Sequence, residues 1–142
     1  MKPLEKLNKL SKYLKTLKVG FVEAMLTTNA SDATERLNGA SGVNIITARP
    51  ELNHSGNRDS LSTAIFVLEK SLGNGRTPEL ESSQYDMLVP IVNQVLSDIG
   101  SAIDSECREG RLAGLNLVSY DVTPETSIFG GWLGWSIELT FE

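Results

Sequence analysis

The strongest constraint on the fold of this chain is the stretch formed by residues 128–142, which holds both of its tryptophans. Apolar and polar residues alternate there from Gly134 onward. The apolar set is Trp135, Ile137, Leu139 and Phe141, and the polar set is Ser136, Glu138, Thr140 and Glu142. Period two is typical of a β-strand with one buried and one wet face. Such a strand needs a partner strand and a covering layer.

Residues 115–123 are the expected partner strand. Their apolar residues fall in two phases, Leu115 and Leu117 in one and Val118, Tyr120 and Val122 in the other. Either a β-bulge or burial of both faces would reconcile the two phases. We expect Pro124 to end this strand, because proline removes a backbone donor. The two strands should then form an antiparallel hairpin.

The expected covering layer is a long helix that begins near Thr77-Pro78-Glu79. This sequence resembles a helix cap, with proline in the first turn and acidic residues near the positive end of the dipole. Its apolar stripe consists of Tyr85, Leu88, Val92, Leu96, Ile99 and Ile103. Pro90 either kinks the helix or marks its true start, and the stripe continues to about Cys107.

Two further strands are predicted upstream. Residues 43–48 are rich in β-branched side chains and end at Arg49-Pro50. Residues 61–70 fit a buried central strand better than a helix, and the polar residues 51–60 between them predict a loop. Residues 19–26 are compatible with either a strand or a continued helix, and residues 31–35 resemble a short helix start.

A basic amphipathic helix is predicted over residues 1–18. Its apolar stripe is Leu4, Leu7, Leu10, Leu14 and Leu17. Six lysines and one glutamate give this segment a charge of +5, so the remainder carries −10 within a net charge of −5. The stripe lies either on its own domain or on a neighbouring subunit. Membrane-surface or nucleic-acid docking through the lysines is the alternative, with a candidate contact face of Lys6, Lys9, Lys12 and Lys15.

These elements predict a single α+β domain over residues 1–142. A basic N-terminal helix (1–18) precedes an acidic body (19–142), in which a mostly antiparallel sheet of four to five strands carries one long helix. The apolar content of 40% and charged content of 22% are ordinary for a globular protein. No stretch approaches the ~20 apolar residues of a membrane span.

We find no catalytic, metal-binding or cofactor-binding motif in the sequence. His54 and Cys107 are the only residues of their kinds, which leaves almost nothing for a nitrogen–sulfur metal site. Gly73-Asn74-Gly75 lacks the remaining residues of a phosphate loop and is interpreted as a turn. The sequence therefore predicts a non-enzymatic protein without cofactor, metal or small-molecule substrate.

The order of these elements resembles the small neck proteins of tailed bacteriophages, in particular the tail-terminator or tail-completion group. The resemblance is carried by the N-terminal helix, the strand–loop–strand segment around Ala48-Arg49-Pro50-Glu51, and the long helix through residues 91–98. It is completed by the last hairpin, around Phe129-Gly130-Gly131-Trp132 and residues 137–141. It is a resemblance of pattern and size over most of the chain.

The resemblance implies a structural virion protein, made in the host bacterial cytoplasm, that forms rings, typically hexamers. Such rings cap the tail tube, join it to the head, contact other neck and tail-tube proteins, and pass DNA without reading its sequence. The candidate subunit-interface residues are Phe129, Trp132, Leu133, Leu4, Leu7 and Leu14. Aromatic residues are enriched in interface cores, although the first three also suit an ordinary hairpin core. An accessory module that docks on an anionic membrane or acidic partner through its N-terminal helix is the alternative function.

Overall fold

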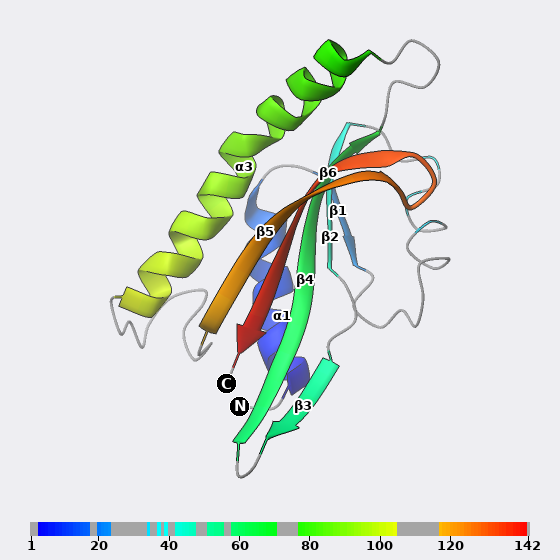
Figure 1. The fold of residues 1–142 in the computed structure, drawn as a ribbon. Coiled ribbons are helices and arrows are strands. Elements are labelled where there is room, and N and C mark those ends of the chain that lie inside the picture. Colours follow the sequence, from blue (N-terminus) through cyan, green and yellow to red (C-terminus); the bar gives the residue numbers. More distant parts are fainter. Residues whose placement is uncertain are drawn as a thin grey trace.

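The computed structural model describes residues 3–17, 20–23, 34, 37, 39, 42–47, 51–55, 58–70, 77–104 and 117–141. It confirms the α+β class: two helices pack on a mostly antiparallel sheet (Figure 1). The strands are β1 (Gly20–Glu23), β2 (Val43–Thr47), β3 (Glu51–Ser55), β4 (Arg58–Lys70), β5 (Leu117–Ile128) and β6 (Trp132–Phe141).

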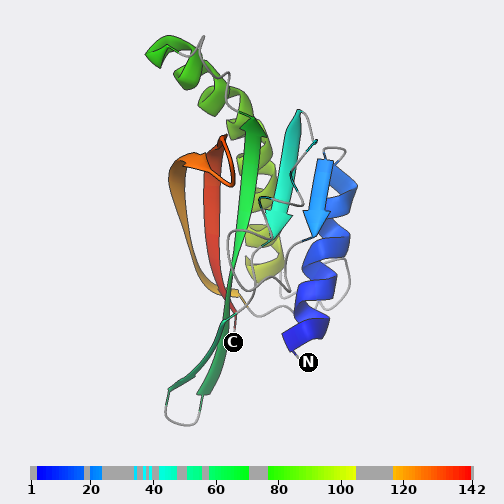
Figure 2. The same cartoon turned by 90° about the vertical axis from the view of Figure 1, so that its right-hand side faces the viewer.

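Four of these strands form a continuous antiparallel sheet in the order β2–β4–β6–β5. The strand β1 extends the β2 edge and pairs with β2 in parallel, which settles the ambiguous segment 19–26 as containing a strand. The remaining strand, β3, pairs with the first part of β4. The β4–β6 ladder begins only at Leu61, so the β3–β4 hairpin projects beyond the body of the sheet (Figure 2).

Both helices lie on one face of the sheet. The helix α1 (Pro3–Leu14) is continued by a 3₁₀ turn, Lys15–Leu17, and α3 (Pro78–Asp104) passes behind the strands in Figure 2. The predicted cap of α3 is confirmed, because the backbone N–H of Leu80 donates to Oγ1 of Thr77 at 3.2 Å. Pro90 lies inside the helix on its exposed side, where the carbonyl of Asp86 that loses its helical partner can reach water.

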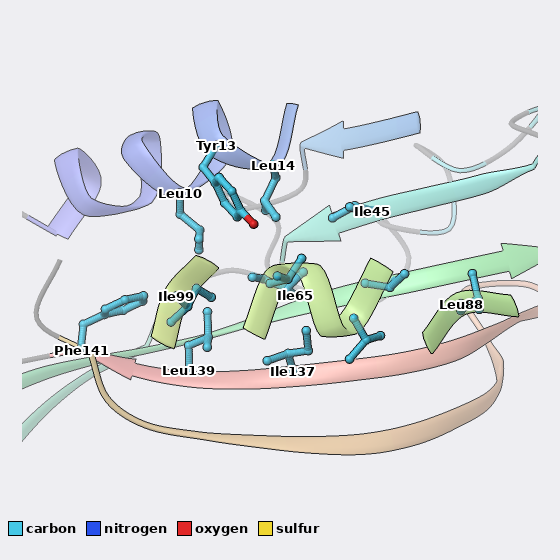
Figure 3. Packing of buried hydrophobic residues seen from close by; sticks show 13 residues of the cluster. Leu10, Tyr13, Leu14, Ile45, Ile65, Leu88, Ile99, Ile137, Leu139 and Phe141 are labelled. Atoms are coloured by element: carbon cyan, nitrogen blue, oxygen red, sulfur yellow. The ribbon is translucent and has the colours of Figure 1, made fainter. Parts of the chain in front are cut away.

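The main core lies between the helices and the sheet (Figure 3). Side chains from α1, β2, β4, α3 and β6 meet in this layer. Its buried members are Leu10, Tyr13, Leu14, Ile45, Ile65, Val67, Leu88, Val92, Val95, Ile99, Ile137, Leu139 and Phe141. The alternating set of β6 therefore faces the long helix as predicted. Trp135 adds a hydrogen bond from Nε1 to the carbonyl of Tyr85 at 3.1 Å.

A smaller core lies on the opposite face, at one end of the sheet. Leu37, Ile46, Leu68 and Trp132 are buried there, with Phe66, Ile128 and Phe129 packed against them. This cluster explains why the polar phase of β6 begins only after Trp132. One end of the sheet is thus buried on both faces.

The prediction of a loop over 51–60 is wrong, because this segment forms most of the β3–β4 hairpin. The ladder pairs Glu51 with Ser62 and Ser55 with Arg58. Only Gly56-Asn57 separates the two strands in the sequence, and a two-residue connection rich in glycine and asparagine is a hairpin signal. A polar sequence can still pair through its backbone.

The prediction that Pro124 ends its strand is also wrong, because β5 continues through it to Ile128. The strand lies at an edge of the sheet, where a missing N–H can face outward. The bulge inferred from the two apolar phases is supported by a register shift between Leu117 and Ser119. The expected hairpin of β5 and β6 is confirmed.

Several predicted features fall on residues outside the described set. These are the glycine turn at 73–75, most of the helix start at 31–35, residues 115–116 and Cys107.

Candidate assembly surfaces

The chemical groups singled out in the sequence do not gather into a reactive site in the structure. Among the described residues, no three histidine, cysteine or acidic side chains lie close enough to hold a metal ion. No helix in this part of the chain is both long and apolar enough to cross a membrane. His54 lies in β3, in the projecting hairpin. The features described next are surfaces that could contact another macromolecule.

The turn between β5 and β6 holds the aromatic candidates for a subunit interface. Trp132 is only 2% exposed and Leu133 is fully buried, so both are already packed inside the chain. Phe129 is half-buried and meets Phe66 edge to face, with ring centroids 5.1 Å apart. Of these three residues, Phe129 alone offers surface to a partner in this conformation.

The conformation of this turn depends on glycine. Phe129 has a φ of 49°, followed by 86° at Gly130 and 107° at Gly131. The N–H of Gly131 donates to the carbonyl of Ile128 at 3.1 Å and closes the turn. A positive φ is uncommon for a bulky residue such as Phe129. The contact with Phe66 accounts for the position of the Phe129 ring.

The helix α1 divides its residues between the core and solvent. Leu10 and Leu14 are fully buried in the main core, and Tyr13 donates a hydrogen bond to the carboxylate of Asp98 in α3. Lys12 and Lys15 are exposed and Lys9 is half-buried. The predicted residues Leu4, Lys6 and Leu7 lie in α1, but their side chains fall outside the described set.

The burial of these leucines shows where the apolar stripe of the N-terminal helix packs. The leucine stripe lies on its own domain, at least through Leu10 and Leu14, rather than on a neighbouring subunit. Leu14 is therefore not available as an interface residue in this conformation. Lys12 and Lys15 keep the position expected for a basic contact face.

The sheet face opposite the helices is largely uncovered away from the small core. We call it the open face and define it by Ser62, Ala64, Ser119, Asp121, Thr123, Glu138 and Thr140. These side chains are half-buried or exposed, and all are small or polar. An antiparallel sheet commonly has one packed face and one solvated face.

Two carboxylates lie side by side on the open face. Asp121 of β5 is directly opposite Glu138 of β6 in the ladder, and both are exposed. Like charges in this arrangement destabilise a sheet. A third carboxylate, that of Glu125, accepts a hydrogen bond from Oγ of Ser136 at 3.0 Å and is half-buried. The open face is therefore acidic near the β5 edge.

The edge strand β5 is exposed along most of its length. Its residues from Ser119 to Pro124 are all exposed, including the apolar side chains of Tyr120 (46%) and Val122 (37%). Tyr120 and Val122 alternate with Asp121 and therefore point to the helix-covered side of the sheet. The alternation in the sequence could have identified these two sides, but only the structure shows that β5 is an edge.

No protein-family model matches the sequence, and no curated protein matches it significantly.

Proposed function

We propose that this chain is a non-enzymatic structural protein that forms rings in the neck of a phage or phage-like tail. In this role it caps the tail tube and joins it to the head, as a tail-terminator or tail-completion protein does. The proposal rests on the resemblance in element order, together with surfaces that suit assembly better than catalysis.

The single observation that carries the proposal is the open face. A wide sheet surface with exposed Asp121 and Glu138 would suit the wall of a channel through which DNA passes. Phosphate groups are repelled by carboxylates, so an acidic wall favours passage over adhesion. Small neighbours such as Ala64 and Ser119 leave this surface smooth.

The projecting β3–β4 hairpin supports the same proposal. It extends beyond the body of the sheet (Figures 1 and 2) and is tied to it through the continuous strand β4. A ribbon of this kind is a suitable arm for clasping a neighbouring subunit or the tail tube. Isolated two-stranded ribbons are marginally stable in water, so contact with a partner would stabilise this one.

Negative-stain imaging and native mass spectrometry of the purified chain test the proposal. We expect closed rings with one stoichiometry at high protein concentration. A variant in which residues 52–60 are replaced by a short Asn-Gly turn should keep the fold, because the β4–β6 ladder starts at Leu61, and should form fewer rings. A strictly monomeric protein that never occurs in virus-like particles would refute the proposal.

The alternative of docking on an anionic membrane has one supporting observation, the exposure of Lys12 and Lys15. Because Leu10 and Leu14 are buried in the main core, such docking would depend on charge. Co-sedimentation with anionic vesicles tests it, with Lys12→Glu expected to weaken binding. Equal binding of this variant and the unchanged protein would exclude the alternative.

A further inference from the structure

The layer of helices is narrower than the sheet it covers. Five adjacent strands at about 4.8 Å spacing are about 24 Å wide, whereas two helices of about 10 Å cover about 20 Å. The helix α3 packs mainly on β6 and β4 and reaches β5 through the hydroxyl of Tyr85, which donates to the carbonyl of Glu125 at 2.7 Å. The exposure of Tyr120 and Val122 on the helix side of β5 follows from this shortfall.

The uncovered edge also carries carboxylates. Asp121 and Glu125 lie on β5, and Glu138 is on the adjacent strand. The carboxylates point to the open face, and Tyr120 and Val122 point to the helix side. A partner at this edge would therefore meet apolar surface on one side and negative charge on the other.

A basic element lies at the opposite lateral side of the same molecule. In Figure 2, β5 is at the left of the sheet, and α1 lies at the right, beside and below β1. Lys12 of this helix and Lys15 of the 3₁₀ turn that continues it are exposed, on the side away from the buried Leu10 and Leu14. The two ends of the sheet thus carry complementary charge.

We propose that the partner of the β5 edge is a second copy of this chain, whose α1 lies over Tyr120 and Val122 and continues the helix layer. In this contact, the long side chains of Lys12 and Lys15 of one copy reach past the edge of β5 toward Asp121 and Glu125 of the other, which lie on the opposite face of that strand. The two patches differ, so the association is head to tail, which closes into a ring when the rotation between copies allows it. This inference rests on the proposed function for the closure of the ring, but not for the contact itself.

The energetics predict a contact that is specific but individually weak. Exposed ion pairs are worth little and are screened by salt, so the charges mainly set orientation and rate of association. The aliphatic stem and ammonium group of a lysine can lie on the ring of Tyr120. Assembly should therefore require several simultaneous contacts and weaken as ionic strength rises.

Charge reversal with rescue tests this contact. Asp121→Lys and Lys12→Glu should each raise the concentration needed for half-assembly by about tenfold, measured by sedimentation velocity at low salt. The double variant should assemble as the unchanged protein does, because the reversed charges again match. A mixture of the two single variants should also assemble. Far-ultraviolet circular dichroism checks that each variant is folded.

Matched controls carry the same charge changes elsewhere. Asp86→Lys on the exposed side of α3 and Lys70→Glu at the end of β4 should leave assembly unchanged. If closed rings form equally well from the single variants and the unchanged protein, this contact is wrong while the proposed function stands. If the oligomers respond to reversal but remain open chains, the contact stands and the ring proposal fails. Absence of association at any concentration overturns both.

Discussion

The hydroxyl of Tyr13 donates a hydrogen bond to Oδ2 of Asp98 and joins α1 to α3 at the margin of the main core. The carboxylate of Asp98 is also held by Gln94, whose Nε2 lies 3.0 Å from each of its oxygens. The two helices are far apart in the sequence, so this link reports on tertiary packing rather than on local structure.

Replacing Tyr13 with phenylalanine should destabilise the fold by about 1.5–3 kcal/mol, the usual range for a hydrogen bond to a charged group. The buried ring remains, so the loss should come from the hydroxyl alone. Urea unfolding followed by tryptophan fluorescence measures the change. Tyr120→Phe, at an exposed position on β5, is the control and should have no effect. Equal effects at both positions would contradict the role of the Tyr13 link.

Replacing Gly134 with alanine should severely destabilise the protein. A Cβ at this position would lie 2.0 Å from the carbonyl oxygen of Val67, and the φ of 153° is unfavourable for other residues. Gly39→Ala is the matched control, because its φ is 81° but the space around it is open. The control should lose only about 1–2 kcal/mol from its backbone conformation. Thermal unfolding of both variants compares the destabilisation caused by the steric clash with that caused by the positive φ alone.

Replacing Thr47 with valine should stabilise the protein by about 1 kcal/mol. Oγ1 of Thr47 is buried without a hydrogen-bond partner, and valine has nearly the same shape. Thr63→Val is the control, since Thr63 is similarly buried but has a polar partner. This second variant should be less stable than the unchanged protein. A loss of stability in Thr47→Val would show that its hydroxyl has a partner in solution.

Neutralising one member of the Asp121–Glu138 pair should raise stability by about 0.2–1 kcal/mol at low salt. Glu138→Gln is the simplest change, and its effect should vanish in 1 M salt, where the Debye length is about 3 Å. Chemical denaturation with urea, which is uncharged, is the suitable measurement. Asp86→Asn on the exposed side of α3 serves as the control. A gain that persists at high salt would indicate a cause other than charge repulsion.

Periodicity made much of the fold predictable. The alternation from Trp135 to Phe141, the apolar run in β4 and the stripe of α3 each report which side chains are buried. Burial is a direct consequence of the spacing of apolar residues, so these elements could be recognised one at a time. The class of the fold followed from their order.

Features that depend on the position of a strand in the sheet could not be predicted in this way. A proline would end a central strand, but Pro124 is tolerated because β5 is an edge strand. Only the strand order reveals that β5 is an edge. The hairpin of β3 is polar and gave no apolar signal. Its existence depends on backbone pairing with β4.

The candidate assembly surfaces were likewise predictable only in part from the sequence. The aromatic turn was visible in the sequence, but the burial of Trp132 against Ile46 and Leu68 was not. Asp121 and Glu138 are distant in the sequence, and their carboxylates become neighbours only through the register of β5 and β6. Register is a property of the whole sheet, so this pair required the structure.

The position of β6 between β4 and β5 also governs how the molecule folds. The β5–β6 hairpin is local and can form within about 1–10 μs, whereas its pairing with β4 closes a loop of tens of residues. Until that step is complete, Ile65 and Ile137 cannot meet beneath α3, and the edge of β4 stays open to intermolecular pairing. Refolding should therefore be limited by this long-range docking, and transient aggregation during refolding should increase steeply with protein concentration.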